Sequence, residues 1–484
     1  ITEISKEIFQ KFKHVIDLDL SDNKLRSLPD PNITMENLTK INLNTNYFTV
    51  VPMTVRTRMP NLRSLYMMQN RIQEIDDVFE HKKLRTLEFN KNQLKSFPQL
   101  VIPKLKRLLL QENRIQEIPK NALENIETIS SLSLFRNDLL LVHPEFLGSS
   151  TESLQYLDLS ENPKLSTIPF DSIKKLSNLL KLTILRTNIS TIPNYAFKGL
   201  SNLETLKISG QHNTKDTHIG EKAFVYLPNL TQLSLEDFKL KHVPNLRGTG
   251  NLRKLILTRN ELKTLPADIC EILPNLEDLH IGFNQLTSLP SLSRCKNLQD
   301  LEIYQNQLTA LPSLSNCTNL LLLKMSHNLV QSFGSSLNGL VSLLDISAKN
   351  NKIESIGEND FKGLEHLETL FLDDNKISYI HKNAFSNFKN LKQLMLGRNN
   401  FPELPTLGLQ TVKKLSIEEN SKLIKFPSPG HLPSIESLHL YYPYHCCAFL
   451  NRKHDRRNDD NSNTTEHTQG TIVSWTWLSN SHPD

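Results

Sequence analysis

Long apolar segments and clustered charge are both lacking in this chain of 484 residues. No run of about 18 consecutive apolar residues occurs, so the sequence encodes no membrane span. The first residues, ITEISKEIFQ, lack the apolar core of a signal peptide, which does not place the protein in the cytosol. With 56 basic and 51 acidic residues, the net charge of +5 is too slight to suggest a nucleic-acid partner. Any attachment to a membrane therefore requires a segment that is not in this sequence.

Signatures of catalysis are missing as well. The sequence contains no glycine-rich phosphate loop, no H-E-x-x-H pair and no C-x-x-C pair. Enzymes need side chains that converge on a pocket, whereas the acidic and histidine residues here fall at variable positions of a repeat. His445, Cys446 and Cys447 offer metal ligands, but their spacing matches no standard zinc pattern. We therefore expect no enzymatic activity, no catalytic residue, no cofactor and no metal site.

What the sequence does contain is an internal repeat. A single globular core stops growing near about 250–300 residues, so a chain of this length holds several domains or a repeat array. The template L-x-x-L-x-L-x-x-N fits many times, for example at Leu62, Leu65, Met67 and Asn70. Its last position is held by Asn23, Asn46, Asn70, Asn92, Asn113, Asn137, Asn162, Asn260, Asn284, Asn306, Asn328, Asn351, Asn375, Asn399 and Asn420, and by Thr187, Gln211, Phe238 and Pro443. These positions define about 19 turns, spaced 21 to 27 residues apart.

The spacing within each turn predicts its structure. The Leu-x-Leu pair has the period of a strand, with both leucines pointing inward and the residues beside them outward. One turn cannot bury its leucines alone, so successive turns stack into one continuous core. The asparagine follows the strand, where its amide can satisfy backbone groups that lack a sheet partner, and stacked copies form a ladder. The predicted fold class is an α/β repeat: a leucine-rich-repeat solenoid, or horseshoe, with a parallel concave β-sheet and an irregular or short-helical convex side.

The second half of each turn follows the pattern I-P-x-x-A-F-x-x-L, as at Ile192, Pro193, Ala196, Phe197 and Leu200. We interpret its phenylalanines as a stacked aromatic spine on the convex side, and a ligand site made by these rings is the alternative. The residues that match Phe197 are Phe79, Phe146, Phe224, Phe361 and Phe385.

The pattern also sets the extent of the solenoid, which we predict for residues 1–450. Ile4 and Phe9 align with Ile192 and Phe197, so the chain begins inside a repeat and we expect an N-terminal cap to be missing. The polar run at 209–220 predicts a bulging loop. Residues 451–470 have almost no apolar content, and we expect 451–484 to be hinge-like or disordered.

Five cysteines are present. Cys270 and Cys295 lie in successive turns, and we predict that they form a disulfide, since neighbouring turns are close enough for bridging. A Cys295–Cys317 pair is the competing arrangement, and free buried thiols are a third. Cys446 and Cys447 are adjacent, and adjacent cysteines rarely pair, so we expect their partners beyond this sequence.

Glycosylation sequons give a weak sign of secretion, because an asparagine-rich chain of this length contains several by chance. We predict glycosylation at Asn32, Asn37, Asn188, Asn229, Asn316 and Asn463.

The concave face is the predicted binding surface, and it suits a protein partner. Basic residues outnumber acids on its early turns, whereas Glu236, Asp237, Glu277, Asp278, Asp300 and Glu302 dominate the later ones. Such a two-signed face would orient a partner and speed its docking. Ordinary solvated strand residues are the alternative interpretation. The predicted ligand-binding residues are Arg63, Tyr66, Arg85, Arg107, Phe135, Arg136, Tyr156, Lys181, Arg186 and Lys207.

The solenoid, its number of turns and its ending together resemble the ectodomain of the leucine-rich-repeat-containing G-protein-coupled receptors. YPYHCCAF, at 442–449, is similar to the motif where that family's repeats join the hinge, which implies that Cys446 and Cys447 are hinge cysteines. DICEILPNL and LSRCKNL resemble the family's paired cysteines between adjacent repeats. The resemblance covers roughly residues 1–450 and favours the long-ectodomain branch, which includes the R-spondin receptors and the insect bursicon receptor. The family's N-terminal cysteine cap, later hinge cysteines and seven-helix bundle are absent from the sequence.

This resemblance implies a function. The chain would capture a secreted cystine-rich protein on its concave face, either a bursicon-like cystine-knot hormone or an R-spondin-like ligand. It would lie at the extracellular face of the plasma membrane, or be secreted if the chain is a soluble form. An extracellular adhesion or matrix protein and a Toll-type pattern receptor are the alternative functions.

Overall fold

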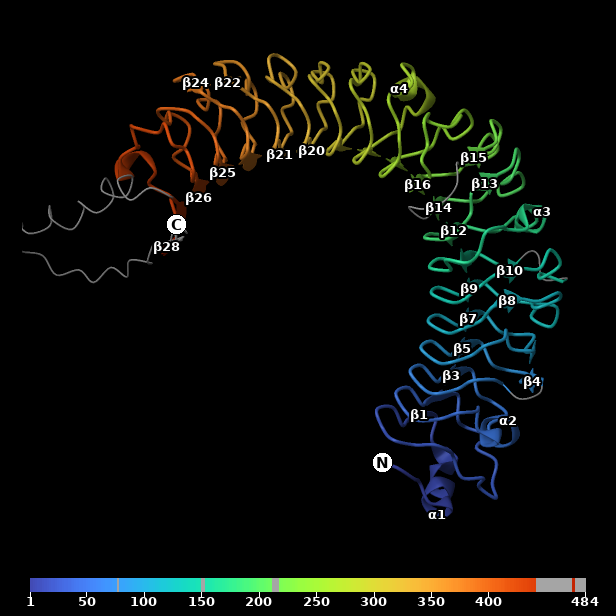
Figure 1. Cartoon of the computed structure of the whole chain (residues 1–484). Helices are drawn as coiled ribbons and strands as arrows, with labels where there is room; N and C mark the ends of the chain where they lie inside the picture. Colours follow the sequence, from blue (N-terminus) through green and yellow to red (C-terminus); the bar gives the residue numbers. More distant parts are fainter. Residues whose placement is uncertain (76–77, 149–152, 211–216, 441–471, 475–484) are drawn as a thin grey trace, which may run out of the picture. The chain divides into compact units, whose positions relative to one another are not determined.

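The computed structural model describes residues 1–75, 78–148, 153–210, 217–440 and 472–474. The chain divides into two compact units. The first unit comprises Ile1–Leu240 and Pro244–Leu252, and the second comprises Lys241–Val243 and Arg253–Asp484. Each unit has its own run of stacked parallel strands (Figure 1). No helix in the described ranges is long and apolar enough to cross a membrane.

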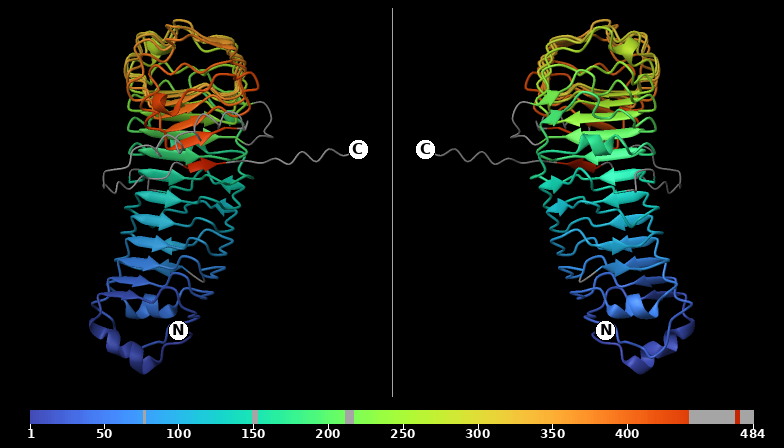
Figure 2. Two further views of the ribbon diagram at one scale, coloured as in Figure 1. Left: turned by 90° about the vertical axis from the view of Figure 1, so that its left-hand side faces the viewer. Right: turned by 90° about the vertical axis from the view of Figure 1, so that its right-hand side faces the viewer.

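In the first unit, each strand pairs in parallel with the strand of the next turn, and Figure 2 shows them stacked side by side. The register aligns the template leucines, so that Leu65 lies beside Leu87 and Leu87 beside Leu108. All three are fully buried. The strands are β1 (Asp17–Asp19), β2 (Lys40–Asn42), β3 (Ser64–Tyr66), β5 (Thr86–Glu88), β7 (Arg107–Leu109), β9 (Ser131–Ser133), β11 (Tyr156–Asp158), β12 (Lys181–Ile184), β14 (Thr205–Ser209) and β16 (Gln232–Glu236).

The second unit repeats this arrangement, with Leu255, Leu279 and Leu301 aligned and buried. Its last strand, β28, pairs in parallel with β27. The strands are β17 (Lys254–Ile256), β18 (Asp278–His280), β19 (Asp300–Glu302), β20 (Leu322–Lys324), β21 (Asp345–Ser347), β23 (Thr369–Phe371), β25 (Gln393–Met395), β26 (Lys414–Ser416), β27 (Ser437–His439) and β28 (Ile472–Ser474). A strand therefore precedes every template position that the sequence identified, which confirms the predicted solenoid.

The opposite side of each unit is irregular, as predicted, and also carries short parallel strand pairs that the sequence did not indicate. Each pair joins adjacent or nearby turns through strands of only two residues, too short to show a period. In the first unit this side holds α1 (Lys6–Gln10), η1 (Lys11–His14), α2 (Met53–Arg58), β4 (Phe79–Glu80), β6 (Leu100–Val101), β8 (Glu117–Ile118), β10 (Leu141–Val142), α3 (Phe170–Ile173), β13 (Thr191–Ile192) and β15 (His218–Ile219). In the second it holds α4 (Ile269–Ile272), β22 (Ser355–Ile356), β24 (Tyr379–Ile380) and η2 (Pro429–His431).

The predicted asparagine ladder is present in both units. Asn284 shows its geometry: the side-chain Nδ2 donates to the carbonyl oxygens of Leu257 and Ile281 at 2.9 and 3.0 Å, and Oδ1 accepts from the Leu262 amide at 3.0 Å. The preceding residue, Phe283, has a left-handed φ of 53°, which turns the chain out of the strand. The same bonds recur at Asn46, Asn70, Asn92, Asn113, Asn137, Asn162, Asn306, Asn328, Asn351, Asn375 and Asn399.

The phenylalanines of the outer side are core residues, which confirms the predicted spine. Phe197 stacks on Phe224 with ring centroids 5.7 Å apart, and Phe361 stacks on Phe385 at 6.3 Å. These four rings are fully buried. Phe9, which the sequence aligned with Phe197, is fully buried as well. Rings sealed inside the stack cannot contact a ligand at the surface.

Cys270 and Cys295 form a disulfide, with their Cα atoms 4.9 Å apart. The predicted pairing is therefore confirmed against the Cys295–Cys317 alternative. Cys317 is a free, buried thiol whose Sγ lies 3.4 Å from the Leu292 carbonyl oxygen. Burial raises the pKa of this thiol to about 11, so it is un-ionised and unreactive at neutral pH.

Replacing both Cys270 and Cys295 by alanine is expected to lower the free energy of unfolding of the second unit. The bond spans a sequence separation of 25 residues, and a cross-link of that length stabilises by about 3 kcal/mol through the entropy of the unfolded chain. Urea unfolding followed by circular dichroism measures the loss. A reducing agent should weaken the natural chain by a similar amount and the variant hardly further. Equal stability of the variant and the oxidised natural chain would contradict the prediction.

Several sequence predictions fall outside the described residues. They are the hinge cysteines Cys446 and Cys447, the sequon at Asn463, most of the 451–484 segment and the centre of the polar loop at 211–216. The proposed solenoid boundary at residue 450 also lies there and stays a prediction.

Candidate functional site

The outward face of each sheet is the candidate binding surface. In most strands the middle residue is buried and its two neighbours are half-buried or exposed, as in β3, where Leu65 is buried between Ser64 and Tyr66. The two outward positions of successive strands are aligned by the parallel register and form two rows across the sheet. Two further rows flank them, one just before each strand and one in the turn after it.

The row at the first strand position brings three predicted residues close together in the first unit. Its members on β7, β9, β11 and β12 are Arg107, Ser131, Tyr156 and Lys181, in that order. Tyr156 is 45% exposed, which is unusual for a large aromatic side chain. Lys181 lies directly beside Tyr156, and Arg107 lies two strands away. This part of the face therefore has an exposed aromatic side chain with a basic residue on each side.

The remaining predicted residues lie in other rows. Tyr66 and Lys207 share the row at the third strand position, but β5, β7, β9, β11 and β12 separate their strands. Arg63 and Arg85 stand just before β3 and β5 at one edge of the sheet. Phe135, Arg136 and Arg186 follow their strands at the other edge. The ten residues therefore spread over the whole width of the face, and Arg107, Tyr156 and Lys181 are its central group.

Acids on neighbouring turns neutralise part of the predicted basic charge. Arg136 lies 3.5 Å from Glu112 and its guanidinium covers the Phe135 ring, and Arg186 lies 2.6 Å from Glu161. Both arginines are in the turn after a strand, with φ near 54° and 53°. The sequence does not reveal this pairing, because partners about 25 residues apart are brought together only by the register. Exposed pairs of this kind contribute about 0–1 kcal/mol each, so they leave the arginines available to a partner.

Three of the acids predicted on the later turns, all of them in the second unit, form ion pairs with basic residues. Asp345 is half-buried two strands away from Asp300, and burial is the main cause that raises the pKa of its carboxyl, with Asp300 adding to the effect. The ion pairs are Lys254 with Asp278 at 2.8 Å, Arg253 with Glu277 at 3.1 Å and Lys324 with Glu302 at 2.6 Å.

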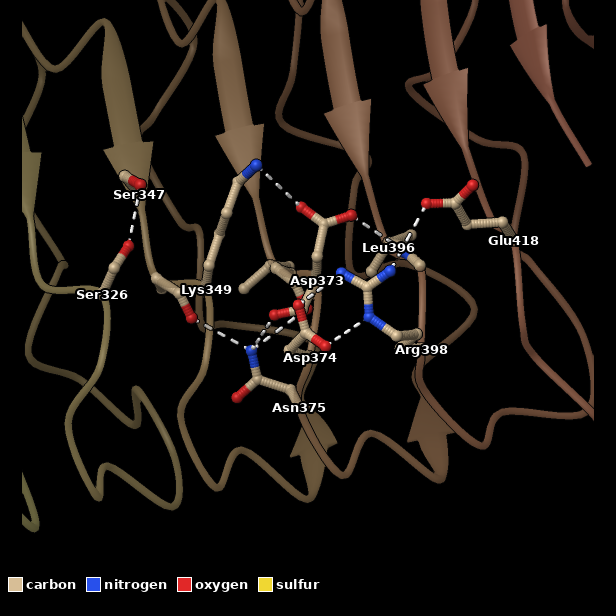
Figure 3. A network of polar contacts seen from close by, with 12 residues as sticks. Ser326, Ser347, Lys349, Asp373, Asp374, Asn375, Leu396, Arg398 and Glu418 are labelled. Carbon is tan, nitrogen blue, oxygen red and sulfur yellow. Dashed lines mark hydrogen bonds and ion pairs between the residues drawn. The ribbon is translucent and has the colours of Figure 1, made fainter. Parts of the chain in front are cut away.

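Figure 3 shows how charged residues link the later turns of this unit. Lys349 lies 3.3 Å from Asp373, and Arg398 binds Asp374 with two nitrogens and lies 3.6 Å from Glu418. The hydrogen bond to Arg398 lowers the pKa of Asp374. Because each ion pair joins one turn to the next, this network stabilises the packing of successive turns.

Aromatic residues also mark the face of the second unit. Phe283 is 40% exposed and packs edge-on against Tyr304, with ring centroids 5.4 Å apart. The Arg259 guanidinium lies 4.9 Å from the centroid of the Phe283 ring. Gly282 permits this packing, since a Cβ at that position would stand 2.8 Å from Cζ of Tyr304.

His280, Asp300 and Glu302, on β18 and β19, form a group in the described part of the chain that could hold a metal ion. From the sequence we expected no metal site, and this group leaves no signal there for a physical reason. The residues lie on different turns, so no local spacing motif connects them, and only the register of β18 with β19 sets them side by side.

The sequons within the described residues are all exposed: Asn32, Asn37, Asn188, Asn229 and Asn316. At Asn229 the side-chain Nδ2, the atom that would carry a glycan, donates to the Ser201 carbonyl oxygen at 2.9 Å. Glycosylation there requires that bond to break, and glycosylation of all six sites stays a prediction.

Comparison with known proteins identifies the repeat. The leucine rich repeat family model matches residues 36–94, 152–212, 250–308 and 346–401. The structure of the Drosophila Toll–Spatzle complex contains a similar chain, with a TM-score of 0.63 and 20% identity over 90% of this chain and 60% of that one, which shows the fold alone.

Three curated relatives are similar in sequence. Leucine-rich repeat-containing G-protein coupled receptor 5 of Xenopus tropicalis is 29% identical over 299 residues, which are 61% of this chain and 28% of the receptor. Receptor 6 of the same name from Homo sapiens is 35% identical over 232 residues, 48% of this chain and 19% of the receptor. Podocan of Mus musculus is 27% identical over 299 residues, 59% of this chain and 46% of that protein.

The matched region thus spans less than a third of either receptor's length. The disulfide between adjacent turns agrees with the resemblance noted from the sequence. The chain folds as a leucine-rich-repeat solenoid, and its sequence resembles the ectodomain of the leucine-rich-repeat-containing G-protein coupled receptors.

Proposed function

We propose that this chain is the ligand-binding ectodomain of a leucine-rich-repeat-containing G-protein coupled receptor of the long-ectodomain branch. Its ligand is a secreted cystine-rich protein, either a bursicon-like hormone or an R-spondin-like growth factor. The chain acts outside the cell, at the plasma membrane or as a soluble form, and its role is binding without catalysis. The similarity to receptors 5 and 6 is the observation that carries this proposal.

The sheet face of the first unit supports a protein partner. Binding energy at protein interfaces concentrates in a few aromatic and arginine side chains surrounded by weaker contacts. Tyr156, beside Lys181 and near Arg107, provides such a centre on an otherwise regular surface. The ion-paired arginines Arg136 and Arg186 lie at the edge, where charge affects the rate of association more than the affinity.

Two other functions have some support. The similarity to podocan favours an extracellular adhesion or matrix protein, and the shared fold with Toll is compatible with a Toll-type receptor. The similarity to podocan covers as many residues as that to receptor 5 of Xenopus tropicalis. The paired cysteines of adjacent turns, which resemble the receptor family's, favour the receptor.

Replacing Tyr156 by alanine is expected to weaken ligand binding about tenfold or more, the loss typical of a central aromatic anchor. The measurement is surface plasmon resonance of the full chain against purified R-spondin-type and bursicon-type proteins. Tyr226→Ala is the matched control, because Tyr226 is 49% exposed and packs against Tyr195, away from the strand rows. It should leave the affinity unchanged.

A second variant tests the electrostatic part of the proposal. Reversing the charge of Arg136 and Arg186 together should slow association at low salt and change dissociation little. Failure of the natural chain to bind any protein of either type would contradict the proposed function. Equal losses of affinity for Tyr156→Ala and Tyr226→Ala would show that the ligand does not bind at the sheet face.

A further inference from the structure

Three side chains with metal-binding atoms converge on the sheet face of the second unit. His280 on β18 lies beside Glu302 on β19, and Asp300 occupies the other outward position of β19. The Nε2 atom of His280 is 3.3 Å from Oδ2 of Asp300, and its Nδ1 atom is 3.6 Å from Oε2 of Glu302. One ligand atom from each residue can be chosen so that all three lie within 4.8 Å of one another.

A neighbouring lysine holds one of these side chains in place, and some of their metal-binding atoms have no hydrogen-bond partner in the described residues. Lys324 lies 2.6 Å from Oε1 of Glu302, which leaves Oε2 facing the imidazole. The His280 Nε2 and Asp300 Oδ1 atoms are inaccessible to solvent and have no hydrogen-bond partner among the described residues. The three side chains are only 14 to 18% exposed. Buried polar atoms without a hydrogen-bond partner are rare in folded proteins, and a bound ion is one of the explanations for them.

We propose that His280, Asp300 and Glu302 bind a divalent transition-metal ion, with Zn²⁺ the best fit. An imidazole nitrogen and two carboxylate oxygens are ordinary zinc ligands, whereas Ca²⁺ and Mg²⁺ prefer oxygen alone. Tetrahedral zinc at about 2.0–2.2 Å from its ligands holds them about 3.4 Å apart. The imidazole gives one of its two nitrogens to the ion, so the carboxylate that now faces the other nitrogen has to turn toward the ion.

The local charge favours a cation at this point. The carboxylates of Asp300, Glu302 and, two strands from Asp300, Asp345 outnumber the single ammonium group of Lys324 among them. The carboxylate of Asp278 on the adjacent strand is paired with Lys254. With three protein ligands, a fourth coordination position stays open toward the sheet face. This position can be taken by water or by a histidine or carboxylate of a molecule that docks there. The metal site is inferred from this cluster alone and does not depend on the proposed receptor function.

The test is zinc binding by the purified full chain after treatment with a chelator, measured by isothermal titration calorimetry with ZnCl₂. His280→Gln is expected to remove one binding event, or to weaken zinc binding by more than about 100-fold, the most that the loss of an outer-sphere partner usually costs. Asp300→Asn should act in the same direction. His366→Gln is the matched control, because His366 is an exposed histidine outside the cluster. This variant should bind zinc with the same stoichiometry and affinity as the natural chain.

Cobalt provides a second measurement that separates this site from cysteine ligands. Co²⁺ held by nitrogen and oxygen atoms in a tetrahedral site gives visible absorption bands without the ultraviolet charge-transfer band of a thiolate. These bands should appear in the natural chain and in His366→Gln and be absent from His280→Gln. Circular dichroism confirms that each variant is folded. Identical zinc stoichiometry and affinity in the natural chain and both cluster variants would overturn the proposal.

Discussion

Replacing Phe361 by alanine is expected to lower the free energy of unfolding of the second unit by about 3–5 kcal/mol, the usual cost of removing a buried phenylalanine. The ring is fully buried and contacts Phe333 at 5.4 Å, Phe385 at 6.3 Å and Phe388 at 5.4 Å between centroids. Phe333 lies on the turn before Phe361, and Phe385 and Phe388 lie on the turn after it, so the cavity would weaken two interfaces between turns. Because each turn is stabilised mainly by its neighbours, the loss should spread along the stack.

Urea unfolding of the full chain, followed by circular dichroism, measures this loss as a shift of the transition to lower denaturant. Phe283→Ala is the matched control, since it removes the same side chain from a position that is 40% exposed. The free energy of unfolding of that variant should fall by less than about 1.5 kcal/mol, and this figure includes the loss of the ring contacts with Tyr304 and Arg259. Losses of equal size in the two variants would show that the aromatic spine is not a central part of the core.

Replacing Asn162 by leucine should destabilise the first unit by about 3–5 kcal/mol, although the two side chains have similar volumes. Asn162 is fully buried, and its Nδ2 donates to the carbonyl oxygens of Leu134 and Leu159 at 3.0 and 2.8 Å. Its Oδ1 accepts from the Leu139 amide at 3.1 Å. Leucine would leave these backbone groups buried without partners, at about 1–3 kcal/mol for each group.

Hydrogen exchange offers a readout specific to the ladder, since the Leu139 amide should exchange much faster in Asn162→Leu. Asn202→Leu is the control: Asn202 is exposed, and its amide makes a bond of 3.0 Å to the Ser177 carbonyl oxygen. This variant should change stability by about 1 kcal/mol or less. Unchanged protection of Leu139 in Asn162→Leu would contradict the structural role of the ladder.

The sequence by itself determined the repeat and most of what lies inside it. Leucines at period two, an asparagine at a fixed offset and a phenylalanine in the second half of each turn are local patterns. Each recurs because every turn meets the same environment, so the strands, the buried Phe361 and the bonds of Asn162 followed from one template. The Cys270–Cys295 bond was predictable for the same reason, since successive turns are neighbours in space.

Only the tertiary structure decided which surface residues meet. Outward positions carry no repeated pattern, and their neighbours lie a full turn away in the sequence. The pairing of Arg186 with Glu161, the separation of Tyr66 from Lys207 and the convergence of His280 on two carboxylates all depend on the register between strands. The buried positions can be predicted from the sequence of a single turn. The neighbours of a surface residue are set only when the turns stack in a particular register.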